Sequence, residues 1–100
     1  MYLASPQEIA AFAHQAALEV IRSYGFNQET NPDHLKMSDV DRNDIIYSIN
    51  QILSNQFKNP SNKKEQMVRK RYIKLAYQEI ERYLQQRLST LQAQIGRAHV

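Results

Sequence analysis

Apolar residues in this chain recur every three or four positions in three separate segments, and no other feature constrains the fold as strongly. This period places them on one side of an α-helix, whereas a strand requires a period of two. Only 2 glycines and 3 prolines interrupt the 100 residues. The pattern predicts an all-α fold: a three-helix bundle with helices at about 5–24, 39–57 and 61–93, the third longer than the others.

The first segment carries helix signals at both of its ends. Ser5 is a suitable N-cap, a proline occupies the first helical position, and Glu8 lies three residues after the cap, which predicts a capping box. Gly25 supplies a left-handed stop, and Phe26 is expected to pack back onto Ile21 in a Schellman ending. The apolar stripe between these ends consists of Ile9, Phe12, Ala13, Ala16, Val20 and Tyr24.

The second segment is rich in isoleucine but has the period of a helix. Its apolar residues are Ile45, Ile46, Ile49, Ile52, Leu53 and Phe57. Ser38 is the expected N-cap, with Asp39 and Asp41 in the first turn, where the helix dipole favours negative charge. The stretch DVDRND also resembles the start of a calcium-binding loop. We favour the helix start, because that loop needs a glycine where Asp44 stands and a glutamate where Asn50 stands.

The third segment is longer than its two partners. Its apolar residues are Val68, Tyr72, Ile73, Ala76, Tyr77, Ile80, Tyr83, Leu84, Leu88 and Leu91. At a rise of 1.5 Å per residue the predicted helix spans about 48 Å, against about 29 Å for each of the other two. The excess predicts that Leu84, Leu88 and Leu91 contact a protein partner, a second copy of this chain, or protein that follows in a longer chain.

The last residues do not continue this apolar pattern. Gln94 to Val100 correspond to the codons CAG ATC GGA AGA GCA CAC GTC, and from its second base this string is the start of a common sequencing-library adapter. We therefore expect residues 1–93 to be a single helical domain truncated at its C-terminus, and residues 94–100 to be a non-native tail. Gly96 is accordingly not interpreted as a helix cap, nor His99 as a ligand.

Charge is distributed unevenly along the chain. The net charge is +3, but residues 1–57 hold 3 Lys/Arg against 7 Asp/Glu, and residues 58–93 hold 9 against 3. Six cations of the third helix fall opposite its apolar stripe: Arg82 and the five candidate nucleic-acid contacts Lys63, Lys64, Lys70, Arg71 and Lys74. Such a face can neutralise nucleic-acid phosphates, and Tyr77 beside it could stack on a base. The alternative is a solvated face that the acidic first half partly neutralises.

Several classes of site are excluded or disfavoured. The chain has no cysteine, which excludes disulfides and thiolate chemistry. No apolar run reaches the roughly 18 residues of a membrane span, and the N-terminus is not typical of a secretion signal, so we expect a cytoplasmic protein. The serines fall at predicted caps or inside helices, and the acids do not pair in a cleft. We predict no catalytic residue, no cofactor and no enzyme activity.

Two histidines, His14 and His34, are candidate metal ligands. We expect His14, beside the apolar face of the first helix, to be partly buried against the 26–38 loop, and His34, next to Asp33, to be solvated. A metal site needs three or four converging donors, so we predict none. A metal-assisted hydrolase that uses His14, His34 and Asp33 is a third alternative for the function.

Two stretches of the first half resemble the small ryanodine-receptor-type repeat, known from calcium channels and as stand-alone bacterial and phage proteins. They are EIAAFAHQAALEVIRSYG and, after a polar loop, KMSDVDRNDIIYSINQIL. The family opens with an Ile/Leu-Ala pair and a His-containing helix, which Ile9, Ala10 and His14 match. Its second helix begins after an acidic stretch and an arginine, which Asp41 and Arg42 match.

The resemblance covers about half of the chain and has departures. Gln15 stands where the family has an acidic residue, Lys36 and Met37 stand near its loop tryptophan, and the third helix replaces its C-terminal segment with Trp and Gly. The resemblance implies a helical interaction module without established catalysis. We predict a non-catalytic protein-interaction module, a fragment of a larger phage or bacterial protein. The alternative is a nucleic-acid-binding protein that uses the basic side of the third helix.

Overall fold

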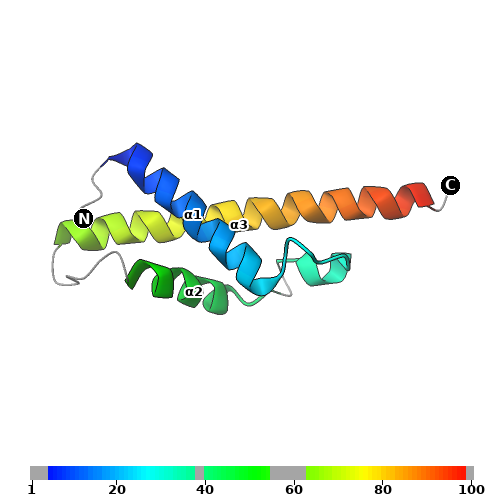
Figure 1. Cartoon of the computed structure of the whole chain (residues 1–100), viewed down its shortest axis with the longest axis horizontal. Coiled ribbons are helices and arrows are strands. Elements are labelled where there is room, and N and C mark those ends of the chain that lie inside the picture. Colours follow the sequence, from blue (N-terminus) through cyan, green and yellow to red (C-terminus); the bar gives the residue numbers. More distant parts are fainter. Residues whose placement is uncertain (1–4, 38–39, 55–62, 99–100) are drawn as a thin grey trace.

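The chain folds into three α-helices and one short 3-10 helix, which confirms the predicted all-α bundle. The computed structural model describes residues 5–37, 40–54 and 63–98. In chain order the elements are α1 (Pro6–Tyr24), η1 (Pro32–Leu35), α2 (Arg42–Ser54) and α3 (Lys63–Ala98), and these residues include no strand. α1 crosses α3 obliquely, and α2 and η1 follow one another along α3 (Figure 1).

The ends of α1 differ in how well the sequence predicted them. Gly25 adopts a φ of 73°, its N–H donates to the Arg22 carbonyl at 3.1 Å, and the Phe26 N–H donates to the Ile21 carbonyl at 3.0 Å. These two bonds form the predicted Schellman ending, with Ile21 and Phe26 both buried. Ser5 is the N-cap, but its side chain makes no capping hydrogen bond. The predicted capping box is therefore wrong, and water can reach this exposed first turn instead.

α2 begins at Arg42 because Asp41 caps it. The Asp41 side-chain oxygen accepts a hydrogen bond from the Asn43 N–H at 2.9 Å, and its carbonyl accepts one from the Ile45 N–H at 3.2 Å. One acidic residue thus satisfies a free N–H and faces the positive end of the helix dipole. The start predicted at residue 39 is wrong. The predicted cap Ser38 and the predicted helix end at residue 57 lie outside the described residues.

α3 continues to Ala98 instead of ending near residue 93 as predicted. A glycine inside a helix costs only about 1 kcal/mol relative to alanine, so Gly96 does not stop it. Nothing lies within 4 Å of the position that a Cβ of Gly96 would occupy, so the helix is unpacked there. The start predicted at residue 61 lies outside the described residues. The non-native origin of residues 94–100 stays a prediction, because a helix can accommodate residues 94–98 whatever encoded them.

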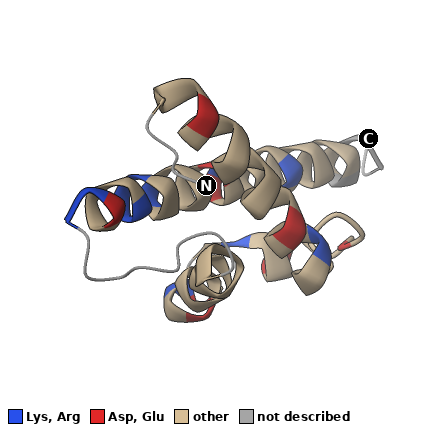
Figure 2. Ribbon diagram, turned by 60° about the vertical axis from the view of Figure 1, so that its left-hand side comes forward, with Lys and Arg blue, Asp and Glu red and all other residues tan. Residues whose placement is uncertain are grey.

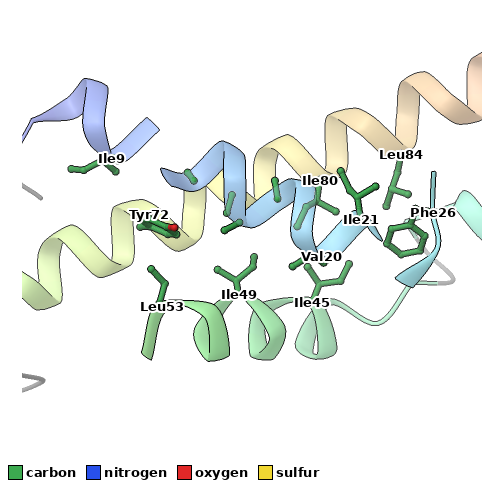
Figure 3. Packing of buried hydrophobic residues seen from close by; sticks show 14 of the residues in the cluster. Ile9, Val20, Ile21, Phe26, Ile45, Ile49, Leu53, Tyr72, Ile80 and Leu84 are labelled. Carbon is green, nitrogen blue, oxygen red and sulfur yellow. The ribbon is translucent and has the colours of Figure 1, made fainter. Parts of the chain in front are cut away.

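The apolar stripes of the three α-helices meet in one core (Figure 3). The buried residues are Ile9, Ala13, Ala16, Ala17, Val20, Ile21, Phe26, Leu35, Ile45, Ile49, Leu53, Tyr72, Ala76, Ile80 and Leu84. α2 contributes Ile45, Ile49 and Leu53, spaced four residues apart and each 0% exposed. The buried side of α1 is rich in alanine, which lets its axis approach α3 closely. The predicted stripe residues Tyr24 and Ile46 are 41% and 36% exposed.

The segment between α1 and α2 is fastened to the C-terminal half of α3. The Glu29 carboxylate accepts hydrogen bonds from the N–H groups of Thr30 and Asn31 at 3.1 and 3.0 Å. Arg87 of α3 donates through Nη2 to the Glu29 carbonyl at 3.0 Å, and Leu35 of η1 is 1% exposed. The segment therefore covers a part of α3 that lies to the C-terminal side of α2 (Figure 1).

Candidate nucleic-acid interface

The five cations predicted as nucleic-acid contacts are all exposed on α3. We call Lys63, Lys64, Lys70, Arg71 and Lys74 together the basic face. A helix turns about 100° per residue, so Lys63, Lys70 and Lys74 form one row along the axis. Lys64 and Arg71 form a second row about a quarter turn away, and the basic face is about 16 Å long.

One large apolar side chain lies between the two rows of the basic face. Met67 follows Lys63 by four residues and Lys64 by three, which places it midway between the rows. Its side chain is 73% exposed, more than any other large hydrophobic side chain in the described part of the chain. Met67 was not predicted as part of the site, although a helical wheel of the sequence places it between the lysines.

The other helices approach α3 away from the basic face. α1 lies on the side of Glu79, whose carboxylate is 3.1 Å from Nδ1 of His14. α2 lies on the side of Arg69, which donates through Nη2 to Oδ1 of Asn50 at 3.1 Å. In α3, the Lys and Arg residues, which are blue in Figure 2, are concentrated near the N-terminal end of the helix. The core thus holds one side of this helix while its basic side faces outward.

The ion pairs His14–Glu79, His34–Glu29 and Lys36–Asp33 do not involve Lys63, Lys70, Arg71 or Lys74 of the basic face. On α3, Glu65 is half-buried on the core side, and Glu81 stands in line with the first row, about two turns beyond Lys74. The predicted neutralisation by the acidic half is not seen in these pairs, and a positive potential attracts phosphate.

The tyrosines near the basic face serve the packing of the helices. Tyr72 is 1% exposed, and burial, with a smaller effect from the negative charge of Glu19, raises the pKa of its hydroxyl to about 12. Tyr77 is half-buried, and the Arg42 guanidinium lies 5.7 Å from the centre of its ring. The prediction that Tyr77 stacks on a base loses its support, because α2 already provides a partner for this ring.

The three leucines predicted to contact a partner do not share one environment. Leu84 is 0% exposed and lies in the core beside Phe26 (Figure 3), so the prediction of a partner contact at Leu84 is wrong. The segment from Gly25 to Met37, and not a partner, packs on this part of α3. Leu88 and Leu91 are partly buried against the same core and are the portion of the predicted contact that reaches the surface.

The two histidines are engaged by different acids. The His14 side chain is 59% exposed and pairs with Glu79 of α3, so the predicted packing against the 26–38 loop is wrong. Position 14 falls on the edge of α1 that faces α3. The His34 side chain is 64% exposed, as expected, and lies 3.2 Å from Glu29 within its own loop. The residues that the structure describes include no group of three His, Cys, Asp or Glu side chains arranged to hold a metal.

Comparison of the chain with protein-family models, with curated proteins and with solved structures finds no match. Among the described residues, no helix combines the length and the apolar character that crossing a membrane requires. The observations that bear on function are therefore those of the molecule itself. Among the described residues, the basic face brings five exposed cationic side chains together on one side of a helix.

Proposed function

We propose that this protein binds nucleic acid, without catalysis, by contacting phosphates with the basic face of α3. The supporting observation is the exposure of five cations on one side of a helix whose other side is held in the core. Val68, Tyr72 and Ile73 pack this part of α3 against the core, so binding has mainly to order the cationic side chains. Each phosphate that is neutralised releases counterions, and this release strengthens binding at low salt.

The first test is the salt dependence of binding. A short fluorescently labelled duplex of mixed sequence is titrated with the protein, and anisotropy gives the dissociation constant between about 50 and about 200 mM salt. Five phosphate contacts predict a slope of log K against log salt of about −4 to −5. Affinity that does not change with salt would contradict the proposal.

Charge reversal locates the contact. The double variant Lys70→Glu/Lys74→Glu is expected to weaken binding by at least about tenfold, because it removes two cations from one row and adds two repulsive charges. Arg22→Glu/Lys36→Glu is the matched control, since it changes the net charge equally at exposed positions outside the basic face. The proposal fails if Lys70→Glu/Lys74→Glu binds as well as the wild type does. Circular dichroism confirms that each variant is folded.

A protein partner is the second candidate function, and the exposure of Leu88 and Leu91 favours it. These side chains lie only partly buried near the end of α3, where the helix continues to Ala98 without packing at Gly96. Self-association that does not depend on salt would support this candidate. A protein that sediments as a monomer at high concentration would count against self-association. The cytoplasmic location and the ryanodine-receptor-type resemblance of the first half stay predictions under either function.

A further inference from the structure

We infer that the basic face binds within the major groove of B-form duplex DNA. The inference rests on the proposed function and names its ligand. Its basis is the arrangement of the cations in two rows, with Lys63, Lys70 and Lys74 in one and Lys64 and Arg71 in the other. A single row could follow one strand of any nucleic acid, whereas two rows can contact two strands at once.

The dimensions of the helix and of the groove agree. An α-helix with its side chains is about 10 to 12 Å across, and the major groove of B-form DNA is about 12 Å wide. Two rows a quarter turn apart on such a helix face outward to either side, where the phosphates of the two strands border the groove. In A-form RNA the major groove is deep and narrow, and side chains do not reach into it.

The strip between the two rows suits the floor of the groove. Met67 lies there and is 73% exposed, and Gln78, which falls between the two rows about three turns further along, is exposed as well. An apolar side chain can contact the methyl group of thymine, which the major groove displays. Glu65, the acid nearest to Met67 in sequence, faces the core side of the helix. No negative charge of this helix therefore stands between the two rows.

The neighbouring helices limit how far α3 can enter the groove. α1 packs on α3 at Tyr72, which bonds to the Phe12 carbonyl, and beside a depression that Ala10 and Ala13 line together with Leu75, Gln78, Glu79 and Arg82 of α3. Most cations of the basic face precede these contacts, and Lys74 lies almost opposite Tyr72 on the helix. The length of the basic face, about 16 Å, corresponds to about five base pairs at 3.4 Å each. The inference therefore assigns contact to residues 63–74 and excludes the C-terminal half of α3.

Groove ligands test the inference directly. Methyl green, which occupies the major groove, is expected to weaken binding to a labelled DNA duplex by at least about tenfold, and netropsin, which occupies the minor groove, is expected to leave it within about twofold. An RNA duplex of the same sequence is expected to bind at least about tenfold more weakly. Equal binding to both duplexes with no effect of methyl green would overturn groove docking while leaving the proposed function standing. Absence of binding to every nucleic acid would overturn both.

A substitution of Met67 tests whether the strip between the two rows enters the major groove. Met67→Glu places a carboxylate toward the base edges and is expected to weaken DNA duplex binding by at least about tenfold. Tyr47→Glu is the matched control, because Tyr47 is 64% exposed on α2 and the change in charge is identical. Both positions are exposed, so neither variant disturbs the core. Equal affinities of the two variants would contradict the placement of Met67 in the groove.

Discussion

The hydroxyl of Tyr72 in α3 donates a hydrogen bond to the main-chain carbonyl of Phe12 in α1, with 2.7 Å between the two oxygens. The two residues are 60 positions apart in the chain, and Tyr72 is 1% exposed. The hydroxyl of a phenol that is buried in an apolar core usually has a hydrogen-bond partner. The bond joins α1 to α3 within the segment of α3 that carries the basic face.

Removal of this hydroxyl should lower stability without changing the fold. Tyr72→Phe keeps the ring and loses the hydrogen bond, so we expect the free energy of unfolding to fall by about 0.5 to 1.5 kcal/mol. Urea denaturation followed by circular dichroism measures the change. Tyr47→Phe removes a hydroxyl from a side chain that is 64% exposed and should leave stability unchanged. A loss of the same size in both variants would show that the Tyr72 hydroxyl has no special role.

The same hydroxyl makes stability depend on alkaline pH. The pKa of Tyr72 is about 12 in the folded protein, against 10.0 for an unperturbed tyrosine. Below pH 10 both states keep the proton, whereas between about 10 and 12 the unfolded chain loses it first, so stability falls as pH rises. Urea denaturation of wild type and Tyr72→Phe at about pH 8 and about pH 11 isolates this effect. The wild type should lose more stability than the variant; an equal loss in both would contradict the raised pKa.

The sequence predicted those parts of the fold that depend on neighbouring residues. The helical period placed Ile45, Ile49 and Leu53 on one side of α2, and all three are fully buried. The pairing of Gly25 with Phe26 predicted the end of α1, because left-handed backbone conformation and chain reversal are local properties. The shared face of the five cations follows from the same period. For such features the sequence contains the information within one or two helical turns.

The remaining features depend on contacts between distant residues. Ser38, Asp39 and Asp41 are all acceptable helix caps by residue type, and in the structure Asp41 accepts the capping hydrogen bond from the Asn43 N–H. The bond from Arg87 to the Glu29 carbonyl joins residues 58 positions apart. A pattern among neighbouring residues cannot indicate such a bond. The burial of Leu84 by the segment from Gly25 to Met37 was therefore not predicted. The sequence thus identified the cations of the site but not which apolar residues stay exposed.

Gly25 offers a test of the turn that directs the chain toward η1. Its φ of 73° is a left-handed conformation, and nothing lies within 4 Å of the position that an added Cβ would occupy. The cost of Gly25→Ala is therefore conformational only, and we expect a loss of about 1 to 2 kcal/mol in unfolding free energy. Denaturant unfolding measures the loss. Gly96→Ala, in a helix interior without neighbours, should instead be neutral or stabilising by about 1 kcal/mol. The same sign of change in both variants would contradict the left-handed turn.

Glu29 is expected to make the loop sensitive to acid. Hydrogen bonds from the Asn31 N–H and from His34 hold the pKa of its carboxyl below the usual 4.5. A lowered pKa contributes stability that is present above pH 4.5 and is lost as pH falls through the folded-state value. In Glu29→Gln this contribution is missing, so its melting temperature should fall less on acidification than that of the wild type. Glu8→Gln, at an exposed position in the first turn of α1, is the control and should retain the acid response.

The leucines of α3 provide the last test, because the fold assigns them different roles. Leu84 is 0% exposed in the core, whereas Leu91 is only partly buried at its margin. Leu84→Ala should leave a cavity and lower the free energy of unfolding by about 2 to 5 kcal/mol. Leu91→Ala removes the same atoms from a site open to solvent, so its loss should be smaller, about 1 kcal/mol or less. Urea denaturation of the two variants at a protein concentration where both are monomeric gives the comparison. If Leu91→Ala costs as much as Leu84→Ala, the loop does not cover Leu84 more completely than it covers Leu91. If both substitutions leave the free energy of unfolding nearly unchanged, the Gly25–Met37 segment does not pack on α3 in solution. Leu84 would then be exposed and accessible to a partner.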